Sequence, residues 1–301
     1  MNTSLSLRSH LLRRVVRWLV APTVSGTAPV AARRRQLERI TKLSRLRFPA
    51  GSQIEATQLG GVPGLWLRNT RVARKRTVLY LHGGAYAVGS TEVYREFNAH
   101  LARAWHAQVA AIDYRLAPEH PFPAALDDAF AAYQALLKQG IAPADLVIAG
   151  DSAGGNLTLA CALRVRDAGL PLPAKLVLLS PWTDMTVSGS SANDKPRDDM
   201  LITQSIRKSA RDYLAGTDAK AALASPLFAD LRGLPPTLIQ VTDTEILLDD
   251  ARRLADALRK AQVPTELRVW PGLWHVWPLF AGKLPEADAA VAEAAAFLDR
   301  T

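Results

Sequence analysis

The sequence has one cysteine, no long apolar run and none of the common motifs for metal or nucleotide binding. Cys161 is the only cysteine among 301 residues, so the chain cannot form an intramolecular disulfide. It follows the apolar run 157–160 and is predicted to be a small buried thiol. Nothing in this content points to an oxidising compartment, so a cytoplasmic location is expected.

Residues 1–50 also lack a clean signal-peptide core and any stretch of about 18 apolar residues. Arg13, Arg14 and Arg17 interrupt the first apolar run, and Pro22 and Pro29 interrupt the next part of the chain. Stable membrane insertion is therefore not expected. The H-E-x-x-H, P-loop and G-x-G-x-x-G motifs do not occur, and no metal or organic cofactor is expected.

The net charge of +9 is concentrated at one end of the chain. Eleven of the 37 lysines and arginines lie in residues 1–50, where Glu38 is the only acid, and the remaining 26 accompany 27 acidic residues. The rest of the protein is therefore electrically balanced. Nucleic acid is not expected as a partner, because no aromatic interleaving or binding motif accompanies the basic residues.

The basic segment also has the periodicity of two amphipathic helices. Residues 5–20 place apolar side chains on one side of a helical wheel and most arginines on the other. The apolar positions are Leu7, Leu11, Leu12, Val15, Trp18 and Leu19 in the first helix, and Leu37, Ile40, Leu43 and Leu46 in the second. We expect both stripes to pack against the rest of the protein, with docking on an anionic lipid surface as the alternative.

From about residue 51, short aliphatic or β-branched runs alternate with longer helical stretches. The candidate strands are 54–59, 65–67, 78–82, 109–114, 146–149, 176–179, 238–241 and 267–270, and the candidate helices are 124–138, 153–168, 247–261 and 286–298. Several strands are continuous apolar runs, which suits a mostly parallel sheet that is buried on both faces. We predict an α/β fold with one catalytic domain, residues 51–301, after an N-terminal helical segment, residues 1–50. Residues 185–222 are polar and then helical, and are predicted to be an insertion over the domain.

A candidate nucleophile, Ser152, lies between a predicted strand and a predicted helix. Residues 150–154 read Gly-Asp-Ser-Ala-Gly, the G-x-S-x-G pattern of a nucleophile elbow. The glycines let the backbone turn sharply and let strand and helix approach closely, so that the hydroxyl stands at the helix N-terminus. The pentapeptide alone is a modest signal, and its context carries the prediction.

A serine nucleophile needs a base, and in α/β hydrolases the chain order is Ser, then Asp or Glu, then His. Of the six histidines only His275 follows Ser152, in a loop that Pro271 and Gly272 specify after the last predicted strand. His275 is therefore the predicted base. His82, at the end of an earlier strand, is expected to be an orienting or structural group.

The carboxylate that orients the imidazole should follow the preceding strand. Four acids do: Asp243, Glu245, Asp249 and Asp250. Their spacing does not choose among them, and the last two also suit the first turn of a helix.

Backbone donors for an oxyanion are expected after strand 78–82, where the chain turns at two glycines. The N–H groups of Gly83, Gly84 or Ala85, together with that of Ala153 after the nucleophile, would stabilise the charge of a tetrahedral intermediate.

These pieces, in this order, resemble the bacterial esterases that are similar to mammalian hormone-sensitive lipase, which have the α/β-hydrolase fold. The resemblance runs from about residue 60 to the C-terminus. It is carried by His82-Gly83-Gly84, by residues 113–124 (D-Y-R-L-A-P-E-H-P-F-P-A), by residues 150–156 (G-D-S-A-G-G-N), by Ser180-Pro181-Trp182, by residues 245–250 and by His275.

The resemblance implies that Glu245 is the triad acid, with Asp249 in reserve, because the family's acid is followed by Leu two places on and by Asp four places on. Glu245 departs from the commoner Asp, and Ala85 stands where the family often has a third glycine. The resemblance also implies a helical cap built from residues 1–50 and the insertion 185–222. The candidates for a cap face that packs on the domain or lines the substrate pocket are Leu5, Leu7, Leu11, Leu12, Val15, Val16 and Trp18.

The implied activity is hydrolysis of small, short-acyl carboxylic esters through an acyl-enzyme. Lactone hydrolysis and deacetylation use the same triad and stay open. A non-catalytic ligand-binding protein is a further alternative, as in the plant gibberellin receptors that resemble these esterases; those receptors have lost the triad histidine, whereas His275 is present. Assembly as a homodimer is also left open.

Overall fold

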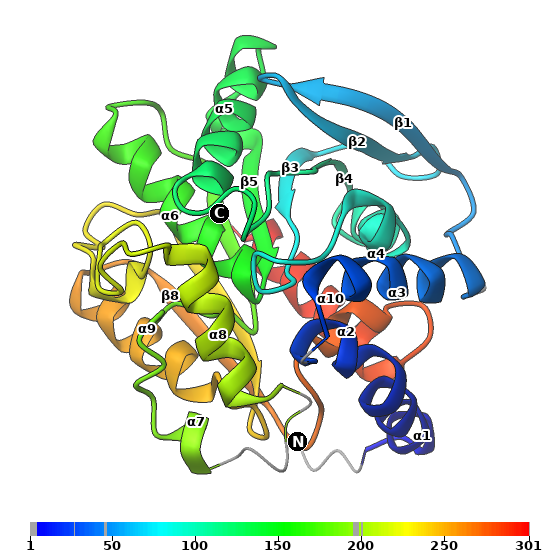
Figure 1. The fold of residues 1–301 in the computed structure, drawn as a ribbon. Helices are drawn as coiled ribbons and strands as arrows, with labels where there is room; N and C mark the ends of the chain where they lie inside the picture. Colours follow the sequence, from blue (N-terminus) through cyan, green and yellow to red (C-terminus); the bar gives the residue numbers. More distant parts are fainter. Residues whose placement is uncertain (1–4, 27, 45–46, 195–198, 200, 301) are drawn as a thin grey trace.

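The computed structural model describes residues 5–26, 28–44, 47–194, 199 and 201–300. In these residues eight strands form one sheet, in the order β1-β2-β4-β3-β5-β6-β7-β8 (Figure 1). The strands are β1 (Ser52–Leu59), β2 (Val62–Asn69), β3 (Arg76–Leu81), β4 (Ala107–Ile112), β5 (Leu146–Asp151), β6 (Lys175–Leu179), β7 (Thr237–Thr242) and β8 (Thr265–Trp270). β2 pairs antiparallel with β1 and β4, and all the other pairs are parallel. The predicted eight-stranded, mostly parallel α/β fold is confirmed.

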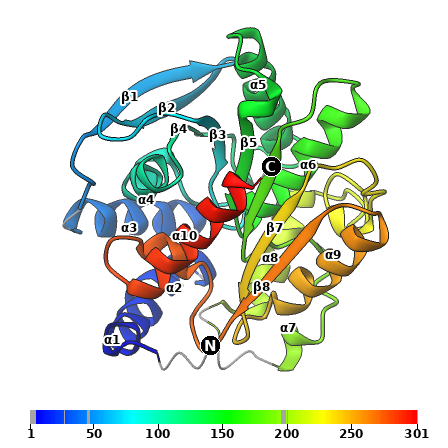
Figure 2. The same cartoon turned by 180° about the vertical axis from the view of Figure 1, so that it is seen from behind.

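Helices cover both faces of this sheet (Figures 1 and 2). Those next to the sheet are α4 (Thr91–Ala104), α5 (Ala124–Lys138), α6 (Ala153–Asp167), α9 (Leu248–Lys260) and α10 (Pro285–Asp299). Before β1 lie α1 (Leu7–Val15), the π-helix η1 (Val16–Val20), α2 (Ala21–Ser25) and α3 (Val30–Leu43), and between β6 and β7 lie α7 (Ser191–Asp194) and α8 (Thr203–Leu214). Short 3₁₀ helices are η2 (Pro143–Asp145), η3 (Pro226–Phe228) and η4 (Trp277–Phe280).

The four helices predicted beside the sheet correspond to α5, α6, α9 and α10, whereas α4 is absent from the prediction. Its N-terminus has two features that commonly mark the start of a helix. The Ser90 side chain caps it by accepting a hydrogen bond from the Val93 N–H, and Glu92 lies in its first turn. Its buried residues include Glu96 and Asn98 as well as apolar ones. These polar residues interrupt the apolar stripe by which a helix is recognised.

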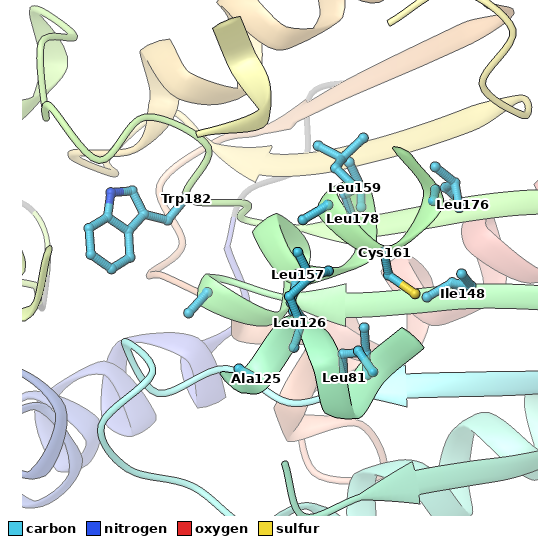
Figure 3. Close-up of a cluster of buried hydrophobic side chains, with 14 of the residues drawn as sticks. Leu81, Ala125, Leu126, Ile148, Leu157, Leu159, Cys161, Leu176, Leu178 and Trp182 are labelled. Atoms are coloured by element: carbon cyan, nitrogen blue, oxygen red, sulfur yellow. The ribbon is translucent and has the colours of Figure 1, made fainter. Parts of the chain in front are cut away.

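Side chains alternate across the strands and build a core on each face of the sheet. In β5, Leu146 and Ile148 belong to the core that includes residues of α5, α6 and α9, whereas Val147 and Ala149 belong to the core that includes residues of α4 and α10. Figure 3 shows part of the first core around Leu81, Leu126, Leu157, Cys161 and Leu178. Cys161 is fully buried and free, which confirms the predicted buried thiol.

The N-terminal helices turn one side toward the rest of the protein. Val16 is buried, and Leu5, Leu12 and Val20 pack beside it in the cluster that contains the loop 273–277. Farther along the chain, Leu37 of α3 is buried, while Leu43 is exposed and Leu46 lies outside the described residues. No helix within the described ranges is long and apolar enough to cross a membrane.

The expectation that the whole first apolar stripe packs against the protein is wrong. The exposed fractions of Leu7, Leu11, Val15, Trp18 and Leu19 are 88, 68, 45, 78 and 52%. The helix has apolar residues on more than one side, and only the side that includes Val16 faces the protein. Amphipathic periodicity identifies such a helix but does not tell which apolar side the fold will cover.

Helix α6 lies against the backbone at the end of β3, and this contact depends on a glycine. A Cβ added at Gly154 would lie 1.9 Å from the Leu81 carbonyl oxygen and 2.6 Å from that of His82. At Gly155 the nearest atom would be the Pro181 Cβ, at 2.8 Å. The closest approach of helix to strand is therefore at Gly154.

We predict that Gly154→Ala lowers the free energy of unfolding by about 3 kcal/mol or more, because the methyl group would force helix and strand apart. Gly155→Ala serves as the control and should cost less, since its nearest neighbours, the Pro181 Cβ at 2.8 Å and Cα at 3.0 Å, lie farther away. Urea unfolding followed by tryptophan fluorescence measures both. Wild-type stability in Gly154→Ala would show that the approach is not tight.

Candidate active site

The strand, turn and helix predicted around Ser152 are present. β5 ends at Asp151, α6 begins at Ala153, and Ser152 between them has φ 53° and ψ −118°, a sparsely populated conformation for a residue with a side chain. The Ser152 N–H donates to the Leu179 carbonyl oxygen, 2.9 Å away, which holds the turn against the end of β6. The serine is thus placed on a strained turn at the start of a helix.

His275 and Glu245 lie in contact, although 30 residues separate them. The Glu245 Oε2 is 2.5 Å from the His275 Nδ1, and both side chains are buried. The strands that precede them, β7 and β8, are neighbours in the sheet, so the loops at their carboxyl ends meet. The histidine predicted as base and the acid taken from the resemblance are therefore brought together.

The other oxygen of Glu245 is held by two donors. Its Oε1 accepts hydrogen bonds from the Ser180 hydroxyl, at 2.7 Å, and from the Thr242 N–H, at 2.9 Å. The Ser180 oxygen in turn accepts from the Val276 N–H, 3.2 Å away and next to His275. These bonds fix the orientation of the carboxylate and tie it to the histidine loop.

The three other acids that follow β7 have different partners. Asp243 accepts a hydrogen bond from the Gly272 N–H at 2.7 Å, and Asp249 accepts from the Ser191 N–H at 2.9 Å. Asp250 is buried and accepts from two backbone N–H groups, those of residues 183 and 184. Within the described residues none of these three is hydrogen-bonded to His275, so geometry favours Glu245.

The surroundings of His275 favour its protonated form. Burial lowers the pKa of His275, but the charge of Glu245 and its hydrogen bond raise it, and the net shift is upward from the usual 6.5. Asp199, from the insertion, also raises it. Burial raises the pKa of Asp199 itself to about 6, although the nearby His275 opposes the shift.

Asp199 joins the insertion to the triad region. Its Oδ2 accepts a hydrogen bond from the Ile246 N–H at 2.8 Å, directly after Glu245 in the chain, and its Oδ1 accepts from the Leu201 N–H at 3.2 Å. Sequence reasoning missed Asp199, because it lies in a polar stretch without periodicity. It also missed Ser180, although the motif Ser180-Pro181-Trp182 carries part of the resemblance.

The backbone after β3 comes beside the nucleophile, but its three candidate donors differ. The Gly83 N–H donates to the Asp151 Oδ1, 2.9 Å away, and is therefore occupied. The N–H groups of Gly84, Ala85 and Ala153 have no hydrogen-bond partner among the described residues. Gly84 has φ 119° and Ala85 has φ 56°, so the loop holds a conformation that side chains seldom adopt.

Asp151 is the centre of a buried network around this loop. Besides Gly83, its carboxylate accepts the hydroxyls of Tyr80, at 2.7 Å, and Tyr94, at 2.9 Å. Burial raises the pKa of Asp151, and these three donors oppose the rise. The strand residue Tyr80 and the helix residue Tyr94 were not singled out from the sequence.

His82 has the contacts of a structural group. Its Nδ1 lies 2.7 Å from the Gly83 carbonyl oxygen, and its ring stacks on Tyr114 with centroids 4.3 Å apart. Burial lowers the pKa of His82, so the neutral imidazole is favoured. The sequence interpretation of His82 as an orienting or structural residue agrees with these contacts.

Ser152 and His275 line one cavity of about 140 Å³. Its walls include Gly83 and Gly84 as well as residues of the N-terminal helices. The N-terminal lining residues are Val20, Ala21, Val24 and Leu37, and Leu201 contributes from the insertion. Within the parts of the chain that the structure describes, no group of three His, Cys, Asp or Glu side chains could hold a metal ion.

A family model described as the alpha/beta hydrolase fold matches residues 78–279. Among similar proteins, an acetyl-hydrolase of Streptomyces hygroscopicus is 46% identical over 245 residues, which cover 81% of this chain and 82% of the relative. An esterase of Acinetobacter venetianus is 37% identical over 291 residues, covering 95% and 93%.

Solved structures agree with this match. An esterase from the bacterial hormone-sensitive lipase family superposes with a TM-score of 0.92 at 39% identity, covering 98% of both chains. The protein EstE5, soaked with p-nitrophenyl butyrate, gives a TM-score of 0.90 at 38% identity, covering 97% of this chain and 98% of that one. The chain belongs to the α/β-hydrolase fold family and, within it, to the bacterial hormone-sensitive lipase family, and it is a carboxylesterase-type hydrolase of small-molecule esters.

Proposed function

We propose that Ser152, His275 and Glu245 form a catalytic triad that hydrolyses short-acyl carboxylic esters in two steps. The observation that carries this proposal is the 2.5 Å contact between the Glu245 Oε2 and the His275 Nδ1, in a histidine that lines the same cavity as the strained Ser152. The order of the three residues along the chain is also that of the fold.

In the first step the Ser152 Oγ attacks the ester carbonyl carbon while the His275 Nε2 accepts the hydroxyl proton. Glu245 holds the imidazole through Nδ1 and stabilises the imidazolium that forms. His275 then protonates the leaving alcohol, which leaves an acyl group on the serine. In the second step water attacks the acyl carbon while His275 accepts its proton. His275 then returns this proton to the Ser152 Oγ as the acyl–oxygen bond breaks, and the carboxylic acid is released.

The oxyanion of each tetrahedral intermediate is assigned to backbone N–H groups. Gly84 or Ala85, with Ala153, would donate to it, because these groups have no other partner among the described residues. Gly83 is assigned a different role, since its N–H holds the loop to Asp151. The removal of a single oxyanion donor elsewhere costs about 100-fold to 1,000-fold in kcat.

The size of the cavity supports a short acyl group. An engineered apolar cavity of about 150 Å³ holds benzene, a molecule of six carbons, and the cavity beside Ser152 is about 140 Å³. Two similar proteins are named acetyl-hydrolase, and these names support acetyl, the smallest acyl group, as the group removed. Deacetylation is therefore a second candidate function within the same chemistry.

We further infer that residues 1–50 and 185–222 act as a cap over the catalytic domain, residues 51–301. Support comes from Val20, Ala21, Val24, Leu37 and Leu201, which line the cavity from those two segments. A cytoplasmic location is inferred from the single buried cysteine.

We predict that Ser152→Ala and His275→Ala each lower kcat for p-nitrophenyl butyrate by about 10⁴-fold or more, because either change removes the covalent step or its base. Wild-type protein should hydrolyse the acetate and butyrate esters much faster than the palmitate. Undiminished turnover by Ser152→Ala would refute the nucleophile assignment, and equal rates for palmitate and butyrate would refute the short-acyl preference.

The choice of acid is tested by comparing Glu245→Gln with Asp249→Asn. Glu245→Gln should lower kcat by about 10⁴-fold, since it removes the charge that stabilises the imidazolium and the correct tautomer. Asp249→Asn, which alters a bond to Ser191 instead, should stay within about tenfold of wild type. If only Asp249→Asn abolished turnover, the acid would be Asp249.

The pH dependence follows from the raised pKa of His275. The base must be neutral, so kcat/KM should fall as the pH drops through that pKa, with a midpoint above the usual 6.5. Glu245→Gln removes the main upward influence, and the midpoint of its residual activity should move to lower pH. The profiles are measured between about pH 5 and pH 9, and an unmoved midpoint would contradict the assignment.

A further inference from the structure

The first helix carries a continuous apolar surface that no described residue covers. Leu7, Leu11, Val15 and Trp18 are spaced four, four and three residues apart, so they lie along one side of the helix formed by α1 and η1. Each is between 45 and 88% exposed. With Leu19, 52% exposed beside them, they form what we call the N-terminal stripe, defined as Leu7, Leu11, Val15, Trp18 and Leu19.

Basic residues flank the N-terminal stripe, and acids are absent from this part of the sequence. Arg8, Arg14 and Arg17 are exposed in the same helix. Residues 1–37 contain no Asp or Glu, because Glu38 is the first acid of the chain. The combination of leucine, tryptophan and arginine around one helix is typical of helices that lie in a membrane interface.

The helix cannot simply roll over to bury the N-terminal stripe. Its opposite side is already in use, since Val16 is buried and Leu12 and Val20 pack beside it. At its start, the Ser6 N–H and hydroxyl donate to the Glu286 carboxylate at 2.6 and 3.0 Å. These contacts fix the orientation of the helix, so that the N-terminal stripe faces outward.

The position of the helix leaves the N-terminal stripe accessible. Figures 1 and 2 both place α1 at the periphery of the molecule, away from the sheet. The following turns, with Val20, Ala21 and Val24, line the cavity that contains Ser152. One helical segment therefore joins an exposed apolar surface to the wall of the active site.

We propose that the N-terminal stripe docks the protein peripherally on an anionic phospholipid bilayer, with its apolar side chains at the level of the acyl boundary and the arginines at the headgroups. Charge favours an anionic bilayer over a second copy of the chain as the partner of the stripe. Two copies that met through the stripe would bring their arginine rims together without any acid of the segment to pair with them, whereas anionic headgroups supply the opposite charge. The proposal goes beyond ester hydrolysis and does not depend on the triad.

The test is flotation of the full-length protein with two kinds of vesicle, phosphatidylcholine alone and equal parts of phosphatidylcholine and phosphatidylglycerol. Binding is expected with the anionic vesicles, and it should weaken when the salt concentration is raised to about 0.5 M. Equal binding to both vesicles, or to neither, would overturn the proposal. Ser152→Ala should bind like wild type, which separates docking from catalysis.

Two double variants remove the two halves of the surface. Arg14→Gln with Arg17→Gln should weaken binding about twentyfold to thirtyfold, at about fivefold for each arginine near an anionic surface. Leu11→Ser with Trp18→Ser should weaken it at least tenfold through the lost apolar contact. The matched control is Arg252→Gln with Arg259→Gln, which removes two exposed arginines of α9 and should leave binding unchanged. All three proteins should hydrolyse soluble p-nitrophenyl butyrate at wild-type rates, which shows that they are folded.

Tryptophan fluorescence locates the contact. Of the seven tryptophans, Trp18 is the one that is mostly exposed. Lipids with brominated acyl chains should quench part of the fluorescence of the wild type, and Trp18→Phe should abolish that quenching. Quenching that persists in Trp18→Phe would overturn the proposed docking face. A dimer in sedimentation velocity that Leu11→Ser with Trp18→Ser converts to monomer, without vesicle binding by wild type, would assign the stripe to a second copy instead.

Discussion

The carboxylate of Asp151 joins the two loops on which the proposed chemistry depends. It is buried and accepts the hydroxyls of Tyr80 and Tyr94 and the N–H of Gly83. A buried carboxylate without such donors would be costly or would become protonated, so the three bonds are needed to keep it in place. In return, it fixes the loop after β3 beside the serine turn after β5. The two loops can meet because β3 and β5 are adjacent parallel strands whose carboxyl ends share one edge of the sheet.

The same principle places the histidine and its acid. β6, β7 and β8 are successive neighbours, and the loops that follow them supply Ser180, Glu245 and His275 in that order. Each polar side chain is held by a group from a neighbouring loop: Ser180 donates to Glu245, and Glu245 contacts His275. The orientation of the imidazole thus depends on the pairing of strands, which the hydrophobic cores on both faces of the sheet stabilise.

Strands β3 to β7 could be predicted because their residues are buried on both faces, so that burial leaves a continuous apolar run such as 146–149 in the sequence. The acid of the triad could not be chosen from spacing. Asp243, Glu245 and Asp249 lie within one short loop and helix start, and their directions depend on turns that sequence distance does not reveal. The resemblance chose Glu245 from the residues that follow it. Asp199 could not be found this way, since its partner Ile246 is 47 residues away and the bond is to backbone, which leaves no pattern.

The N-terminal helix shows that periodicity predicts the presence of a helix better than it predicts which side of the helix the fold covers. Its sequence contains two apolar sides, one with Val16 and one with Leu11, and hydrophobicity alone does not rank them. The fold covers the side with Val16, because Leu273, Trp274 and Trp277 form an apolar cluster there and Glu286 accepts the bonds of Ser6. The side with Leu11 remains in water, which costs free energy in an isolated monomer, and its arginine rim lacks nearby acids in the sequence. A surface with exposed apolar side chains and a basic rim without nearby acids in its sequence is stabilised by a partner that is apolar inside and anionic outside. An anionic phospholipid bilayer combines these two properties.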